Sequence, residues 1–279
     1  ASKKNLNDHL LPGLEPLGVP KSLKNKVFPF KKNDINDLKK INKKINLGVV
    51  KVEIARNELP DKIFLKKLRK FCNEKKIILI FDECTSGFRR NLGGIHMTTG
   101  VYPDIAMFGK ALGNGYAINA IIGKKKIMKA AEKSFISSTF WTERIGFVAA
   151  NKTLDYMRKK KSYKNLIING KYLNSKWKEL SEKHKVKIKI KGIESITSFT
   201  FNNNNLLYKT FVSQEMLKYG YLASNLVYLS ILHKKKIIDK YIFYLDKVFE
   251  KIKLHQISKK KYKILKGPIS HSTFKRLTD

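Results

Sequence analysis

Short apolar runs alternate with longer amphipathic stretches in the first half of this chain. Residues 49–54, 77–81 and 104–108 are runs of strand length that read as strands; residues 77–81 are apolar at every position, whereas Lys51 and Glu53 interrupt the first run. An uninterrupted run of this kind is typical of a strand covered on both faces. Between the first two runs, residues 61–75 repeat apolar side chains at helical spacing. The inner face of this helix is expected to hold Ile63, Phe64, Leu65, Leu68, Phe71 and Cys72. The order predicts parallel βαβ units with right-handed crossovers, and hence an α/β fold.

The remaining chain has a less regular pattern. Residues 1–46 are irregular, with a short helix expected at 33–46, and residues 87–100 read as a glycine-rich loop. Basic residues 158–161 indicate a domain boundary, which divides the chain into a partial large domain (1–158) and a smaller α+β domain (159–279). The other expected elements are strands at 119–123, 186–191 and 195–201 and helices at 142–157, 170–184, 207–219 and 236–253.

Composition narrows the class of protein. The 279 residues carry a formal net charge of +37, yet only seven of the 59 basic residues are Arg, and the lysines are spread along the chain. Because readout of phosphates and bases favours Arg, this charge favours a solvated lysine surface over a specific nucleic-acid site. A basic protein that binds nucleic acid or acidic surfaces stays the alternative. No apolar run approaches the roughly 20 residues that span a bilayer, so no membrane partner is expected.

The cysteines and histidines set further limits. Cys72 and Cys84 are the two cysteines, which fits a reducing cytoplasm without a disulfide framework. Neither lies in a cluster with metal-ligand spacing, and the six histidines are scattered. We therefore expect no metal site.

Asp82 and Lys110 are the strongest candidates for chemistry. Each lies at or just past the end of a predicted strand, where ligands collect in open α/β sheets. A lysine amine can form a Schiff base with a carbonyl-bearing cofactor, and a carboxylate can pair with a protonated ring nitrogen. The alternatives are ordinary, because Asp82 could be a helix N-cap or a buried ion-pair partner, and Lys110 is one of many lysines.

Two segments carry a resemblance to a known family. FDECTSGFR at 81–89 and FGKALGNGY at 108–116 resemble the pyridine-nitrogen and cofactor-lysine motifs of class III pyridoxal-phosphate aminotransferases. Residues 138–144 are similar to a phosphate-binding segment of the family, in the form that this segment takes among relatives of glutamate-1-semialdehyde aminomutase. The resemblance implies the fold type I PLP-transferase architecture.

The resemblance also implies roles for individual residues. Lys110 would hold pyridoxal 5′-phosphate as a Schiff base and then move a proton. Asp82 would keep the pyridine nitrogen protonated, and Cys84 would stand where Val usually packs on the ring face. Glu53 resembles a Glu-Pro strand end, although Ile54 replaces the proline. Thr139 or Thr142 would bind the cofactor phosphate across a homodimer interface.

The resemblance leaves gaps as well. The family's phosphate loop and ring-stacking aromatic residue lie upstream of its two motifs, and neither is found in this sequence. We therefore expect a C-terminal fragment with impaired, weak cofactor binding. The expected activity is amino-group transfer between small amines and carbonyl compounds, by an aminotransferase or by an aminomutase acting on glutamate-1-semialdehyde. A degenerate relative that serves only as a dimer subunit is the remaining alternative.

Overall fold

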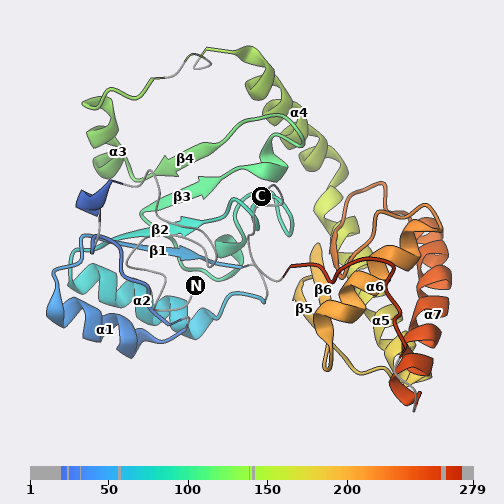
Figure 1. Ribbon diagram of the computed structural model, residues 1–279. Coiled ribbons are helices and arrows are strands. Elements are labelled where there is room, and N and C mark those ends of the chain that lie inside the picture. The colour runs from blue at the N-terminus through green and yellow to red at the C-terminus, as the bar shows by residue number, and fades with distance from the viewer. Residues whose placement is uncertain are drawn as a thin grey trace.

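A four-stranded sheet forms the first half of the molecule (Figure 1). The computed structural model describes residues 20–23, 25–31, 33–55, 58–137, 139, 142–258 and 262–271. The strands lie in the order β1-β2-β3-β4, with the first three parallel and β4 antiparallel. Their bounds are Val49–Glu53 (β1), Ile78–Asp82 (β2), Ile105–Phe108 (β3) and Ala120–Gly123 (β4). The predicted strands are therefore present, and β1, β2 and β3 end at the same edge of the sheet.

Two amphipathic helices, α1 (Ile35–Lys44) and α2 (Lys62–Glu74), pack on one face of this sheet (Figure 1). Each begins at an aspartate whose carboxylate accepts backbone N–H groups of the first turn, Asp34 for α1 and Asp61 for α2. The prediction for Ile63 is wrong, because this side chain is 68% exposed. It occupies the solvent side of the first turn of α2, while Phe64 and Leu65 are buried.

The expectation that β2 is covered on both faces is also wrong. Leu79 and Phe81 are fully buried, whereas Ile78 and Ile80 on the other face are only half-buried. Because side chains alternate along a strand, only the face against α2 forms a core. Between β2 and β3 the chain forms turns and a short 3₁₀ helix, η3 (Ile95–Thr98), rather than a long crossover helix.

The second half packs three helices with a small antiparallel sheet, ordered β5-β6-β7 (Figure 1). Trp177, Phe199 and Phe249 are fully buried at its centre. Its strands are Ile188–Ile193 (β5), Ile196–Phe201 (β6) and Leu226–Tyr228 (β7). Its helices are Ser162–His184 (α5), Asn205–Leu217 (α6) and Lys235–Ile257 (α7). The sequence did not predict β7 and placed the start of α5 eight residues too late.

A long helix, α4 (Arg144–Lys160), leads from the first half to the second (Figure 1). It ends at Lys161, whose left-handed backbone (φ 48°) separates it from α5 near the expected domain boundary. A short helix before it, α3 (Lys125–Glu132), was not predicted. None of the helices in the described part of the chain is long and apolar enough to cross a membrane.

An ion pair fixes the two halves to each other. The Arg90 guanidinium donates to Glu194, with nitrogen–oxygen distances of 3.0 Å to each carboxylate oxygen. Arg90 lies in the loop after β2, and Glu194 lies in the turn between β5 and β6. Ile193 and Ile196, which flank this turn, are buried in the core of the first half. The loop after β2 is thereby held against the second half.

Candidate active site

Asp82 is the last residue of β2 and lies at the carboxyl edge of the sheet. One carboxylate oxygen accepts the Cys84 backbone N–H at 3.1 Å, and the other pairs with the Lys51 ammonium at 2.9 Å. Burial raises the pKa of Asp82, but these two partners outweigh burial and hold the pKa below its usual value. Asp82 is therefore an anion that can accept a positively charged hydrogen-bond donor.

Lys110 follows β3 through Gly109 and opens a one-turn 3₁₀ helix, η4 (Lys110–Leu112). Its backbone lies in the left-handed region (φ 47°), which is unusual for a residue with a side chain and is concentrated at functional positions. The Lys110 ammonium donates to the Thr85 hydroxyl at 2.8 Å. Thr85 is buried, so this contact holds an otherwise exposed amine at the edge of the sheet.

Cys84 lies within the electrostatic reach of both candidates. Burial and the Asp82 carboxylate raise the pKa of the Cys84 thiol, and the Lys110 ammonium opposes them. Neighbouring Gly109 has no room for a side chain, because a Cβ there would lie 2.3 Å from the Asn119 amide oxygen and 3.7 Å from the Cys84 sulfur. The structure thus brings Asp82, Cys84 and Lys110 to one edge of the sheet, as the sequence indicated.

The outcome for the other predicted residues differs. Glu53 ends β1 and stands opposite Asp82 in the strand register, so it belongs to the same edge. Thr139 and Thr142 are exposed and lie in the segment between α3 and α4. Two hollows lie in the surface around Lys110, and neither Thr139 nor Thr142 lines either of them. Among the described residues, no hydrogen bond joins Thr139 or Thr142 to Lys110, whose side-chain partner is Thr85.

Three further residues of the site were not singled out from the sequence. Besides Thr85, they are Glu83, which is fully buried, and Arg89, whose Nε donates to the Thr85 carbonyl at 2.8 Å. The sequence did carry a signal for Glu83. Side chains alternate along a strand, so the residue after Asp82 points to the opposite, buried face of the sheet. A charged residue needs partners there. Thr85 and Arg89 both lie in the motif at 81–89, but neither was given a role from the sequence.

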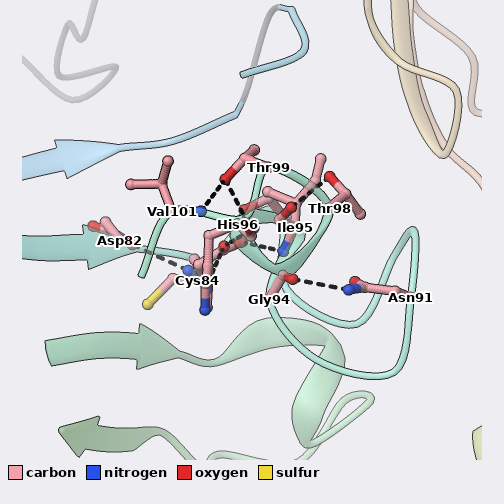
Figure 2. Close-up of polar contacts among 11 residues, drawn as sticks. Asp82, Cys84, Asn91, Gly94, Ile95, His96, Thr98, Thr99 and Val101 are labelled. Atoms are coloured by element: carbon pink, nitrogen blue, oxygen red, sulfur yellow. Dashed lines mark hydrogen bonds and ion pairs between the residues drawn. The ribbon is translucent and has the colours of Figure 1, made fainter. Parts of the chain in front are cut away.

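Glu83 holds the loop that follows Asp82. Its carboxylate accepts the backbone N–H groups of Ile95 at 3.1 Å and His96 at 2.9 Å, the His96 ring Nδ1–H at 2.8 Å, and the Ser86 hydroxyl. Further contacts within the loop include the Asn91 amide donating to the Gly94 carbonyl (Figure 2). Figure 2 shows Asp82 and Cys84 beside this hydrogen-bonded loop. The loop is therefore a rigid support for the site.

Comparison with known proteins gives this geometry a context. Residues 57–225 match the family model described as aminotransferase class III. The chain belongs to this family. The family predicted from the two motifs is thus confirmed.

The matched relatives include two kinds of enzyme. The chain is 34% identical over 202 residues to a 3-aminobutyryl-CoA aminotransferase of Cloacimonas acidaminovorans, a match that covers 69% of this chain and 49% of the relative. It is 30% identical over 282 residues to a glutamate-1-semialdehyde 2,1-aminomutase of Wigglesworthia glossinidia brevipalpis, covering 90% of this chain and 64% of the relative. The chain therefore spans about half to two thirds of the length of these relatives.

Solved structures confirm the predicted fold type I architecture. The FumI protein of Sphingopyxis sp. MTA144, in its PLP internal aldimine form, superposes with a TM-score of 0.80 at 24% identity, over 86% of this chain and 61% of that protein. An omega-transaminase from Sphaerobacter thermophilus gives a TM-score of 0.74 at 19% identity, over 84% of this chain and 59% of that protein. The α/β arrangement built from local patterns is thus a known one.

Proposed function

We propose that this chain carries the cofactor-lysine half of a pyridoxal-phosphate-dependent enzyme that transfers amino groups. One observation supports the proposal above all: the strand ends place the Lys110 amine, held by Thr85, at the same edge as the Asp82 anion. Family membership and the match to a structure that contains the cofactor point the same way.

The chemistry of these side chains suits the cofactor. Lys110 supplies an amine that can attach covalently to the cofactor carbonyl. Asp82 is ionised and can hold a protonated ring nitrogen, and the half-exposed Lys51 ammonium would give way to this new partner. When bound, pyridoxal phosphate supplies an electron-withdrawing ring that stabilises a carbanion beside the transferred amine. The free amine of Lys110 would accept and return a proton.

The phosphate of the cofactor needs a separate account. Thr139 and Thr142 are exposed residues between α3 and α4. We propose that one of them meets the cofactor phosphate of a second subunit, which makes the active form a homodimer. The two free cysteines, Cys72 and Cys84, support a reducing compartment such as the cytoplasm.

Covalent trapping tests the proposed role of Lys110. Pyridoxal phosphate is added to the purified chain, the linkage is reduced with borohydride, and labelled peptides are mapped by mass spectrometry. Because weak binding is expected, cofactor is used in excess, and we expect Lys110 to be labelled more strongly than any other lysine, with loss of this label in Lys110→Ala. Lys126→Ala, in another exposed lysine, is the matched control and should label as the parent does. Equal labelling across many lysines in both parent and Lys110→Ala would refute the proposal.

Two activities stay open within the family. Both 3-aminobutyryl-CoA aminotransferase and glutamate-1-semialdehyde aminomutase are among the matched relatives. Incubation of the chain with pyridoxal phosphate and glutamate-1-semialdehyde separates them. Formation of 5-aminolevulinate supports an aminomutase, whereas transfer of nitrogen from an amino donor to a separate keto acid supports an aminotransferase.

A further inference from the structure

Two hollows meet beside Lys110. One is a groove of about 590 Å³ that includes Lys110 itself. The other is a cavity of about 440 Å³, which extends along α4 to the start of α5 and the chain after β7. The residues that line both are Arg89, Ala111, Asn114, Tyr116, Leu229 and Ser230. A ligand that reacts at Lys110 therefore has continuous space reaching Arg89.

The Arg89 side chain is fixed in place without a counter-ion. Its Nε donates to the Thr85 carbonyl at 2.8 Å, and its guanidinium carbon lies 5.0 Å from the centre of the Tyr228 ring. These contacts use one of five N–H donors. Among the described residues, no carboxylate lies within 4.0 Å of the guanidinium. Arg89 is half-buried, and this burial lowers its pKa.

The neighbouring Arg90 provides an internal comparison. Arg90 makes two contacts with the Glu194 carboxylate and fixes the two halves of the molecule to each other. Arg89, one residue earlier, turns instead into the hollow that also contains Lys110. A partly desolvated cation without an anion nearby is unfavourable until an anion arrives. The two arginines therefore have different roles, one structural and one open to a ligand.

The remaining charges around the hollows have the same sign. The charged residues lining them are Arg89, Lys110 and Lys152, and no Asp or Glu of the described chain lines either one. A hollow lined by charges of one sign concentrates ligands of the opposite sign. The arrangement also has a fixed span, because Thr85 holds the Lys110 amine through its hydroxyl and Arg89 through its carbonyl.

We propose that Arg89 binds an oxyanion of the ligand that reacts at Lys110, and so selects anionic ligands over neutral ones. The planar guanidinium matches a carboxylate or phosphate through two parallel hydrogen bonds. This proposal rests on the proposed function for its biological meaning. The oxyanion is either a carboxylate of the amino donor or acceptor, or the phosphate of the cofactor, and the test distinguishes these sources.

Binding of unreactive probes tests the proposal without cofactor. The full chain is titrated calorimetrically with succinate, with its neutral analogue succinamide, and with inorganic phosphate. Arg89→Gln removes the charge, Arg89→Lys keeps the charge but not the planar fork, and Lys129→Gln is the control. Lys129 is exposed on α3 and does not line either hollow. Circular dichroism establishes that each variant is folded.

We expect saturable binding of succinate or phosphate, with succinamide at least tenfold weaker than succinate. Arg89→Gln should weaken oxyanion binding about 10-fold to 100-fold, because a charge-assisted contact is lost, and Lys129→Gln should stay within about twofold of the parent. Arg89→Lys should lose about fivefold, and this variant decides the question if Arg89→Gln fails to fold. Preference for succinate identifies a substrate carboxylate, and preference for phosphate identifies the cofactor.

Other results would overturn the proposal. These are equal binding of succinate and succinamide, no saturable binding of either oxyanion at millimolar concentration, or unchanged affinity in the folded Arg89 variants. Because the titrations need no attached cofactor, they can still be interpreted if the trapping experiment finds no label on Lys110. Failure of one proposal is therefore distinguishable from failure of the other.

Discussion

Substitution of Glu83 tests whether the loop after Asp82 is a rigid support. Glu83 is fully buried and accepts four hydrogen bonds: from the Ser86 hydroxyl, the Ile95 N–H, and the backbone and ring N–H groups of His96. Each Glu83 oxygen accepts two of these bonds. In Glu83→Gln, one oxygen becomes an NH₂ group. This group cannot accept from the backbone N–H that it faces, whereas the Ser86 hydroxyl or the His96 ring nitrogen beside it can accept a hydrogen bond instead of donating one.

The size of the effect follows from this count. A buried donor left without an acceptor costs roughly 1–3 kcal/mol, part of which is recovered when the loop shifts. One backbone donor left without its acceptor then gives a destabilisation of about 1–3 kcal/mol for Glu83→Gln. Glu83→Ala removes all four contacts and should cost about 4 kcal/mol, in the range for disruption of a buried charged network.

Urea unfolding and amide hydrogen exchange measure this prediction. Glu83→Gln should lower the unfolding midpoint by roughly 1 M urea. The Ile95 and His96 amides should exchange much faster than in the parent. Glu74→Gln is the matched control, because Glu74 is largely exposed in a long 3.9 Å ion pair with Lys70 and should change stability by less than about 0.5 kcal/mol. A midpoint shift equal to that of the control, with both amides still protected, would refute the reasoning.

Three other predictions concern the rest of the chain. Burial raises the pKa of Glu215, but two lysine partners outweigh burial and bring the pKa to about 2. The ionised Glu215 therefore stabilises the folded chain above about pH 4.5, and this stability is lost as the pH falls toward 2. Glu215→Gln should remove up to about 3 kcal/mol at pH 7 and flatten the acid side of the stability profile. Gly170→Ala should destabilise the second half by more than about 2 kcal/mol, since its Cβ would lie 1.9 Å from the Glu194 carbonyl oxygen. Gly48→Ala is the control, because a Cβ there meets open space and should destabilise the chain only slightly. With a net charge of +37, the parent should gain thermal stability when salt rises from about 0.02 M to 0.3 M, and no change would contradict a self-repelling lysine surface.

Local patterns predicted most of the secondary structure, and the exceptions have physical causes. The strand β7 has only three residues, which is too few for a period of two to stand out. The first two turns of α5 were missed because Gly170 reads as a helix breaker. In the folded chain it is the position where the helix meets the backbone of Glu194, and a side chain there would clash. Local preference and tertiary packing thus gave opposite indications at this residue.

The candidate site was predicted in part. Asp82 and Lys110 each follow an apolar run that forms a strand, so their place at the sheet edge follows from local sequence and parallel pairing. The roles inferred for Thr139 and Thr142 stay predictions, because they depend on a second subunit. Thr85 and Arg89 were missed, since a hydroxyl and a guanidinium among many polar side chains carry no periodic signal.

The sequence by itself determined which segments become the four strands of the first sheet and which family motifs stand at their ends. It also determined that Asp82 and Lys110 stand at strand ends, where the reactive pair is proposed, because both signals are local. Only the tertiary structure decided their partners: Lys51 against Asp82, Thr85 against Lys110 and Tyr228 against Arg89. Each partner comes from another element, so the contact depends on strand order, register and the docking of the two halves. Those distances arise when the chain packs, and no local period encodes them.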